Sequence, residues 1–267
     1  MKTLMLSERS IHAGNLILVN GQHPCYREIA ESALVPIPGD GDKILLERRA
    51  AALLGRLMSD IDGWGRIVAV SGWRSEGEQR GIYDRSLREN GAAFTAQFVA
   101  EPNHSEHQTG LAIDLGLKQA ELDFIRPGFP YSGICQTFRE KAAAYGFIER
   151  YPKGKEAITG IAHEPWHFRY VGVPHASIMT ELGLTLEEYH AFLKRHPHGT
   201  RSFAYQSGRQ AFAISYAAAA GREAVLEIEA DCPYLISGNN MDGFVLTEWR
   251  SLGDERQRLS AKEAARC

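Results

Sequence analysis

Apolar residues recur at spacings of three and four over 43–61, which is the pattern of an amphipathic helix. Ser75 followed by Glu78 forms a capping box, so a second helix is predicted to begin there and to end near Gly91. Further helices are predicted over 135–145, where a glycine follows, and from 185 to about 196, where a second capping box stands at the start.

Shorter apolar runs bounded by turn residues indicate strands. After Gly199 the chain consists of such runs, separated by turns that contain Gly and Asn, which is typical of a small β module. The segment 161–170 is expected to lie on or beside a strand. The other predicted strands cover 14–19, 67–70, 203–216, 225–229 and 244–249.

This mixture of helices and short strands predicts an α+β protein. The chain has 267 residues, of which 44% are hydrophobic, so it can form one full domain and a smaller module. We assign 1–198 to the main domain, 199–253 to a β-rich appendage of unknown role, and 254–267 to a charged tail.

Composition and charge exclude several classes of protein. The net charge is −3, whereas nucleic-acid-binding domains usually carry a basic excess, so no nucleic-acid partner is expected. The chain has neither the apolar core of a signal peptide at its start nor an apolar run long enough to span a membrane. A cytoplasmic protein is therefore expected. The four cysteines are scattered and form no Cys-x-x-Cys pair, which favours reduced thiols.

The segment Ser105-Glu106-His107-Gln108-Thr109-Gly110-Leu111-Ala112-Ile113-Asp114 carries the first candidate chemistry. His107 and Asp114 are seven residues apart, and a turn at Gly110 is needed to bring both side chains to one point. Asp114 lies within an apolar run, where a carboxylate is costly to bury unless it is paired or binds a cation. Metal coordination would compensate that cost.

A second segment, His163-Glu164-Pro165-Trp166-His167, adds an imidazole and a carboxylate. Its proline disfavours a helix, so it differs from the helical zinc motifs. Two histidines and one aspartate would leave one position open on a tetrahedral zinc ion, which is typical of catalytic sites. Glu164 would then be free to transfer protons. A histidine beside an apolar run is more often structural, and we interpret six of the others in that way: His12, His23, His175, His190, His196 and His198. His104 and His163 flank the motifs, so a role in supporting the site or contacting substrate stays open for them beside a structural one.

In these motifs the chain resembles the VanY-type D-alanyl-D-alanine carboxypeptidases and the related VanX and VanXY dipeptidases, which share a fold with the hedgehog signalling domain. The family pattern Ser-x-His-x-x-Gly-x-Ala-x-Asp matches 105–114, and Glu-x-x-His matches 164–167. A third family motif, Ser-Gly-Tyr-Arg-Ser with a later Gln, corresponds to 71–75 and Gln79, with Trp73 in place of Tyr. The resemblance covers about residues 10–195.

The resemblance implies a zinc D,D-peptidase domain with a small antiparallel sheet flanked by helices. It implies one Zn²⁺ per chain and removal of the terminal D-Ala from peptidoglycan precursor peptides ending in D-Ala-D-Ala. Glycopeptide (vancomycin) resistance is the biological role that this activity would suit. The implied roles are zinc ligand for His107, Asp114 and His167, catalytic base for Glu164, stabiliser of the oxyanion for Arg74, and substrate contact for Gln79, Ser105 and Arg74.

Several alternatives stay open at this point. The same scaffold supports D-Ala-D-Ala dipeptidases and other hydrolases of cell-wall peptides, and room at the mouth of the pocket, which 117–134 can shape, decides among them. A zinc-bearing binding module without catalysis is a more remote reading, because Glu164 beside the third ligand has no purpose in such a module. The sequence sets neither the oligomeric state nor a preference between D-Ala and D-lactate ends.

Overall fold

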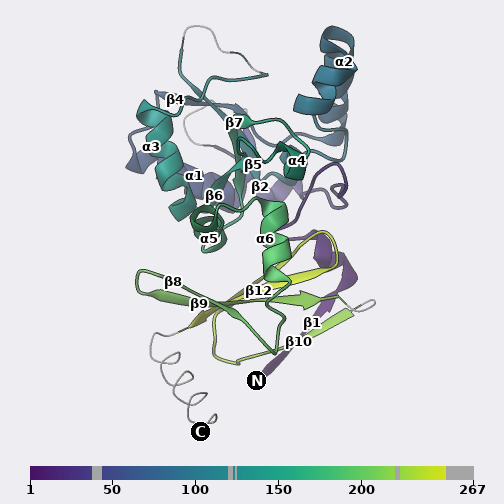
Figure 1. Ribbon diagram of the computed structural model, residues 1–267, viewed down its shortest axis with the longest axis vertical. Coiled ribbons are helices and arrows are strands. Elements are labelled where there is room, and N and C mark those ends of the chain that lie inside the picture. The colour runs from purple at the N-terminus through teal and green to yellow at the C-terminus, as the bar shows by residue number, and fades with distance from the viewer. Residues whose placement is uncertain (38–43, 120–122, 124, 220–222, 251–267) are drawn as a thin grey trace. The chain divides into compact units, whose positions relative to one another are not determined.

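The structure is a computed structural model, and it describes residues 1–37, 44–119, 123, 125–219 and 223–250. The chain divides into two compact units: unit 1 comprises Met1–Ile17 and Glu188–Cys267, and unit 2 comprises Leu18–Glu187. The predicted tail, 254–267, lies outside the described residues. Each unit is considered by itself below (Figure 1).

A four-stranded antiparallel sheet forms the centre of unit 2. Its strands stand in the order β4 (Ile67–Ser71), β5 (Ala112–Leu117), β7 (Glu164–Tyr170) and β6 (Phe147–Tyr151). A short hairpin of β2 (Leu34–Pro36) and β3 (Leu45–Glu47) lies outside this sheet. The predicted strand at 67–70 is confirmed by β4, and the one within 161–170 by β7.

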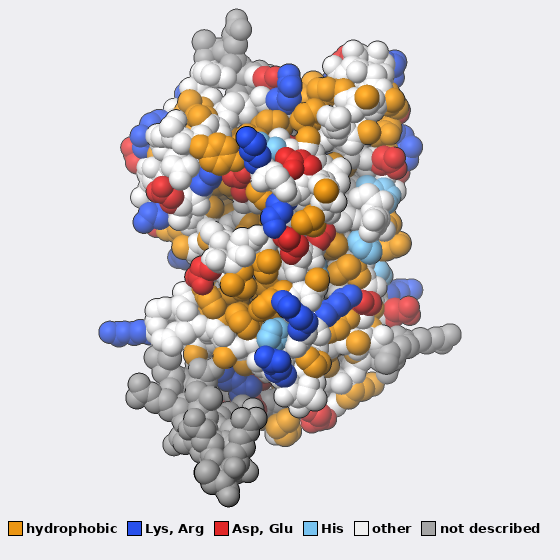
Figure 2. Space-filling view, in the orientation of Figure 1, with side chains coloured by type: hydrophobic (Ala, Val, Ile, Leu, Met, Phe, Trp, Pro, Cys, Tyr) orange, Lys and Arg blue, Asp and Glu red, His pale blue; other side chains and the backbone are white. Residues whose placement is uncertain are grey.

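Helices flank this sheet, as expected. They are α1 (Arg48–Asp60), α2 (Glu76–Phe98), α3 (Gly133–Ala142), α4 (Glu156–Thr159) and α5 (His175–Leu182), with short 3₁₀ turns η2 (Glu31–Ala33), η3 (Glu106–Thr109) and η4 (Ala143–Tyr145). In Figure 1, α1, α3 and α5 gather on one side of unit 2, and α2 stands apart on the other. Acidic and basic side chains are intermixed over the visible face of unit 2 (Figure 2).

Helix α1 begins five residues later than the pattern predicted. Residues 45–47 pair with β2 as strand β3, and Glu47 then caps the helix, because its side chain accepts hydrogen bonds from the backbone N–H groups of Arg49 and Ala50. The apolar face of α1 is buried, with Ala50, Leu54 and Leu57 fully enclosed. The helix predicted from the periodicity is therefore present, and it begins later because residues 45–47 form strand β3.

Helix α2 begins at the predicted capping box, where Ser75 accepts from the backbone of Glu78 and the Glu78 side chain accepts from the backbone of Ser75. It does not end near Gly91. Gly91 has a φ of 81° and interrupts the helical backbone, and the helix resumes beyond it and continues to Phe98. A glycine can take this conformation without the strain of a Cβ, so Gly91 produces a kink here and not an end.

Unit 1 is mainly β structure. Strands β11 (Tyr234–Gly238), β12 (Gly243–Arg250), β9 (Gln210–Ala218) and β8 (Phe203–Ser207) form one antiparallel sheet, and β1 (Lys2–Ser7) pairs with β10 (Glu223–Ile228) in another. The single strand predicted over 203–216 is a hairpin, because the chain turns at Gly208 with a φ of 57°. The unit also contains η1 (Glu8–His12), and the boundary with unit 2 falls within α6 (Leu186–Leu193).

The observed division differs from the predicted domain boundary after residue 198. Residues 1–17 belong with the C-terminal segment, because β1 pairs with β10 along its whole length and Ile11 packs in a core with Ala224 and Phe244. The strand predicted over 14–19 is absent from the described structure, although its four apolar residues are buried. An apolar run reports burial, and it cannot by itself distinguish a strand from an irregular buried segment.

Among the described residues, no helix is both long enough and apolar enough to cross a membrane. Cys25, Cys135 and Cys232 are free thiols, as the sequence predicted for them.

Candidate functional site

Strand register brings the two candidate motifs together. Asp114 on β5 lies directly opposite His167 on β7, and Glu164 starts β7 opposite Tyr151 on β6. His107 comes from η3, and the turn that follows it is closed by Gly110 with a φ of 70°. The predicted turn at Gly110 is thereby confirmed, and it places His107 beside Asp114 despite their odd separation in the sequence.

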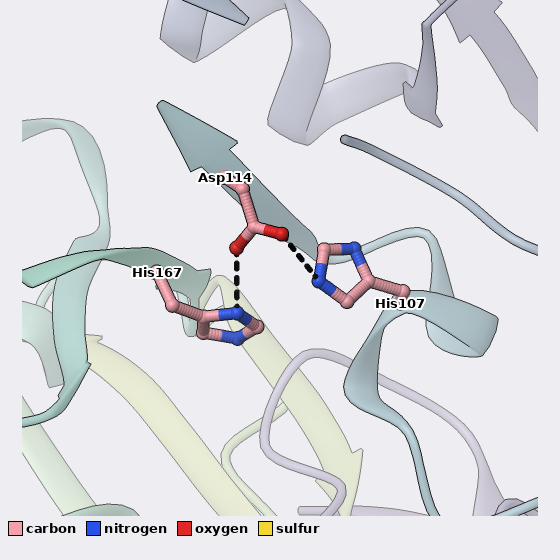
Figure 3. Close-up of side chains that lie close together, drawn as sticks. All are labelled: His107, Asp114 and His167. Carbon is pink, nitrogen blue, oxygen red and sulfur yellow. Dashed lines mark hydrogen bonds and ion pairs between the residues drawn. The ribbon is translucent and has the colours of Figure 1, made fainter. Parts of the chain in front are cut away.

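The Asp114 carboxylate lies between the two imidazoles (Figure 3). Its Oδ1 is 2.9 Å from His167 Nδ1, and its Oδ2 is 3.2 Å from His107 Nε2. One ligand atom from each of the three residues falls within 4.8 Å of the others, so the group is close enough to hold a metal ion. Both imidazoles are buried, so an ion bound to them would be shielded from water on the side of the two rings.

The hydrogen bond at His107 Nδ1, the ring nitrogen that faces away from Asp114, indicates which nitrogen of this ring is free to bind a cation. His107 Nδ1 is 2.7 Å from the carbonyl oxygen of Gly72. A carbonyl only accepts, so Nδ1 carries a proton and Nε2 points at the Asp114 carboxylate. Burial and the nearby Arg74 lower the pKa of His107 to about 4, which disfavours a second proton on Nε2 at neutral pH. A lone pair facing a carboxylate requires a cation between them, and a metal ion meets that requirement.

The charges around Asp114 keep it ionised. Burial alone would raise its pKa, yet His107 and His167 hold the pKa of this carboxyl well below its usual range. Burial opposes a charge on His167 as well, and the carboxylates of Asp114, Glu106 and Glu164 nevertheless raise its pKa to about 9. Without a metal His167 is therefore protonated at neutral pH, and a bound cation would displace the proton from the nitrogen that faces Asp114. The donor set would then be two imidazole nitrogens and one carboxylate, which is a set that zinc prefers.

Glu164 lies beside this group. Its Oε2 is 3.8 Å from His167 Nδ1, and only 7% of the residue is exposed. Burial, with the Asp114 charge assisting and His167 and Arg74 opposing, raises the pKa of Glu164 to about 8. A carboxyl whose pKa lies near neutrality can both take up and release a proton, which a general acid–base group must do.

All seven predicted site residues line one cavity of about 300 Å³. Besides the four already described, they are Arg74, Gln79 and Ser105. Arg74 Nε has no hydrogen-bond partner in the part of the chain that the structure describes. Burial lowers the pKa of Arg74, while the Asp114 and Glu164 charges act in the opposite direction. The structure therefore brings the candidate residues together, and their individual roles stay predictions.

Gln79 uses part of its hydrogen-bonding capacity inside the protein. It is 1% exposed, and its Nε2 donates to the carbonyl oxygen of Ala100 over 2.7 Å. The carbonyl fixes the orientation of the amide, because only its N–H end can face an acceptor. One N–H and the Oε1 atom of Gln79 thus remain for a ligand, and Oε1 has no partner among the described residues.

Beneath the site lies a buried ionic network that our reading of the sequence missed. Glu106 Oε1 accepts hydrogen bonds from Arg150 and Arg169, each over 2.8 Å, and Glu187 accepts two from Arg150, over 2.6 and 2.9 Å. The Arg150 and Arg169 side chains are fully buried. A weaker form of the signal at Asp114 was present, because both arginines stand in short segments rich in apolar and aromatic residues, although Glu149 and His167 interrupt those segments.

Comparison with known proteins agrees with these observations. The family model for VanY, D-alanyl-D-alanine carboxypeptidase, matches residues 43–173. The bifunctional D-Ala-D-Ala dipeptidase and D-Ala-D-Ala carboxypeptidase VanXYC of Enterococcus gallinarum is 46% identical over 179 residues, which are 67% of this chain and 94% of that protein. The chain belongs to the VanY family. A D-alanyl-D-alanine carboxypeptidase of Enterococcus faecium is 30% identical over 254 residues, 91% of this chain and 77% of the relative.

Solved structures of family members have the same fold. The vancomycin resistance D,D-dipeptidase VanXYg, in complex with a D-Ala-D-Ala phosphinate analogue, is 49% identical, with a TM-score of 0.89 over 93% of this chain and 99% of that one. The D,D-pentapeptidase VanY from a VanB-type resistance cassette, in complex with Zn(II), is 32% identical, with a TM-score of 0.54 over 66% of this chain and 98% of that one. The predicted D,D-peptidase fold is thus confirmed.

Proposed function

We propose that this VanY-family chain is a zinc-dependent D,D-peptidase that releases the terminal D-Ala from peptidoglycan precursor peptides ending in D-Ala-D-Ala. The observation that carries the proposal is the convergence of His107, Asp114 and His167 on one point, with the Glu164 carboxylate beside them in a cavity. The names of the relatives support the substrate class, since they describe D-Ala-D-Ala carboxypeptidases and dipeptidases.

The proposed metal site uses His107 Nε2, Asp114 and His167 Nδ1, the atoms that face one another. A bound zinc ion supplies Lewis-acid chemistry and lowers the pKa of a coordinated water to about 7. We propose one ion per chain, because the three residues form one group. Zinc in the VanY neighbour supports the choice of metal.

Glu164 is the proposed general base. At the pH where its carboxylate is ionised it accepts a proton from the attacking water, and the resulting acid then donates that proton to the amine of the departing D-Ala. Its pKa of about 8 suits both steps, because the proton gained in the first is not held too tightly for the second.

Arg74 is the proposed partner of the negative charge that grows on the carbonyl oxygen during attack. Its charge is permanent, and its Nε is not engaged by any described residue. Ser105 and the remaining N–H of Gln79 are the proposed contacts to the free carboxylate of the substrate. Both residues are buried in the cavity wall, so they are held in place before the ligand arrives.

A second candidate activity is hydrolysis of free D-Ala-D-Ala. It is favoured by the similarity to the dipeptidase VanXYg, which extends over 93% of this chain and therefore over most of both units. Cleavage of the precursor peptide would remove its terminal D-Ala, and cleavage of the free dipeptide would leave less D-Ala-D-Ala to build such ends. Both outcomes fit the vancomycin resistance named for that relative. A cytoplasmic location remains a prediction, which fractionation of cells that express the chain would test.

The test compares two substrates under the same conditions. We expect the zinc-loaded chain to release D-Ala from a muramyl pentapeptide ending in D-Ala-D-Ala, from the free dipeptide, or from both, and to lose this activity with a chelator. Glu164→Gln should lower kcat by about 10²- to 10⁴-fold and keep its zinc, because it removes the base and leaves the ligands in place.

Glu140→Gln, a substitution of an exposed carboxylate on α3, serves as the control and should keep full activity. D-Ala release that persists after zinc removal, or a Glu164→Gln enzyme with most of its kcat, would show that the proposed mechanism is wrong.

A further inference from the structure

Glu106 is buried, and its side chain faces His167, one of the proposed metal ligands. Only 2% of the residue is exposed, and its two oxygens face different neighbours. Oε1 accepts from Arg150 and Arg169, while Oε2 faces His167 Nε2 at a distance of 3.5 Å. Neither Oε2 nor His167 Nε2 has a hydrogen-bond partner within the described ranges. Two complementary buried atoms therefore face each other, slightly farther apart than an ordinary hydrogen bond.

The network around Glu106 keeps its carboxylate charged and fixed. Glu106 and Glu187 carry two negative charges, and Arg150 and Arg169 carry two positive ones, so the buried group is neutral as a whole. Both guanidinium groups bond the same Glu106 oxygen, which leaves the other oxygen directed at His167. A carboxylate held on one side by two arginines has little freedom to turn away from the imidazole.

The other nitrogen of His167 faces the proposed metal site. Nδ1 is 2.9 Å from Asp114 Oδ1, on the side where the three candidate ligands converge. A neutral imidazole that offers a lone pair at Nδ1 must carry its proton on Nε2. Glu106 Oε2 can accept that proton in a hydrogen bond, and such outer carboxylates commonly orient metal-binding histidines and raise their basicity.

We propose that Glu106 is a positioning residue, which fixes His167 as the Nε2–H tautomer and so directs the Nδ1 lone pair at the metal. The inference rests on the proposed zinc site. His107 has the mirror arrangement, since its Nδ1 donates to the Gly72 carbonyl and its Nε2 faces Asp114. Each imidazole thus has an acceptor on its outer side. For His167 that acceptor is a charged group, which Arg150 and Arg169 hold in place.

Glu106→Gln tests this role with little change in shape. The amide oxygen can still accept from the two arginines, but its NH₂ group then faces His167 Nε2 and can only donate. This reverses the polarity of the contact and favours the tautomer with the proton on Nδ1, the atom that should bind the metal. We expect zinc affinity, measured by competition with a chromogenic chelator, to fall about 10- to 100-fold.

Glu187→Gln is the matched control. Glu187 bonds Arg150 in the same network, and its described hydrogen bonds do not involve His167. It should lose stability without losing zinc affinity. The proposal is overturned if Glu106→Gln binds zinc within about twofold of the wild type, or if both variants lose affinity equally, because the network would then act only on the fold. A wild-type chain that binds no zinc would instead overturn the proposed metal site itself.

A measurement on the wild type keeps the test independent of how the variants fold. ¹⁵N-detected NMR of the zinc-loaded protein distinguishes the two imidazole nitrogens, with the His167 ring assigned through its couplings to its own backbone. We expect metal on Nδ1 and a hydrogen-bonded proton on Nε2 of His167. A spectrum with zinc on Nε2 would exclude the assigned role of Glu106, whatever the affinities of the variants.

Discussion

Arg74 combines a fixed charge with a guanidinium nitrogen left unpaired by the described residues, and it does so inside the active-site cavity. Its backbone N–H donates to the carbonyl oxygen of His107, so the main chain at Arg74 is joined to that of a proposed metal ligand. The Asp114 and Glu164 charges favour its charged form against the cost of burial. A permanent, directional donor placed in this way suits a charge that develops only during the reaction.

Replacement of Arg74 by Lys should distinguish the effect of the positive charge from that of the planar guanidinium. Lysine keeps the charge but loses the planar fork, so we expect Arg74→Lys to lower kcat/KM by about 10²- to 10³-fold while zinc content is unchanged. Arg80→Lys, at an exposed position on α2 where the arginine pairs with Glu76, should be neutral. Steady-state kinetics with metal analysis checks both. Arg74→Lys with wild-type kcat/KM would argue against an oxyanion role.

For single residues, the sequence indicated that some charged side chains are buried but did not indicate their partners. Asp114 could be predicted because a carboxylate within an apolar run needs a partner or a cation, and the structure places it between two imidazoles. Arg150 and Arg169 carried a weaker form of this signal but could not be matched to Glu106 and Glu187, because that pairing depends on where η3 and α6 fold against the sheet. Buried charges are visible in a sequence, whereas their partners depend on tertiary contacts.

At the scale of elements, local signals were reliable where a short motif decides the backbone. The capping box at Ser75 and the turn at Gly110 both depend on a few neighbouring residues, and both are confirmed. The predicted start of α1 was wrong, because residues 45–47 pair with β2, a neighbouring segment outside the helical pattern itself. The strand predicted at 14–19 was wrong, because its apolar residues are buried without pairing to a strand. Strand β1 was missed as well, and its partner β10 lies at the other end of the chain. Strand β11 was missed although its partner β12 follows it directly.

Gly110 links the 3₁₀ turn that carries His107 to the strand that carries Asp114, so its substitution should affect the metal site. Its φ of 70° disfavours a side chain, and a Cβ would come within 3.2 Å of the Glu47 backbone nitrogen and 3.0 Å of Leu34 Cδ2. We expect Gly110→Ala to destabilise the fold by about 1–3 kcal/mol and to weaken zinc binding. Urea unfolding and chelator competition measure the two effects.

Gly154 supplies the matched control for that substitution. Its φ of 85° carries a similar backbone strain, but a Cβ there would meet nothing within 4 Å, and the residue is exposed. Gly154→Ala should therefore cost some stability and leave zinc affinity unchanged. If Gly110→Ala also retains wild-type zinc affinity, the turn does not determine the placement of His107.

At the scale of the whole molecule, the ion pairs among the described residues of the two units differ in number and in burial. Unit 2 buries the network of Glu106, Arg150, Arg169 and Glu187. In unit 1 the ion pair of Lys194 and Asp242 is largely exposed, and the pair of Arg250 and Glu248 is mostly buried. An exposed ion pair contributes little to stability, but a buried one becomes costly when either partner is lost. Acid should therefore destabilise unit 2 through this network, because protonation of a buried carboxylate leaves its arginine partner unpaired.

The pH dependence of unfolding tests that expectation through Glu187. Burial opposes its charge, yet Arg150 lowers its pKa below the ordinary value, so the folded state binds its proton less readily than the unfolded chain. The resulting stability is fully present above about pH 4.3, the usual pKa of an unfolded Glu, and is lost as the pH falls through the folded pKa. With a chelator present throughout, urea unfolding from pH 7 to pH 3 should show wild type and Glu187→Gln furthest apart near neutrality and converging below about pH 4. A constant gap across that range would mean that the Glu187 charge does not stabilise the fold.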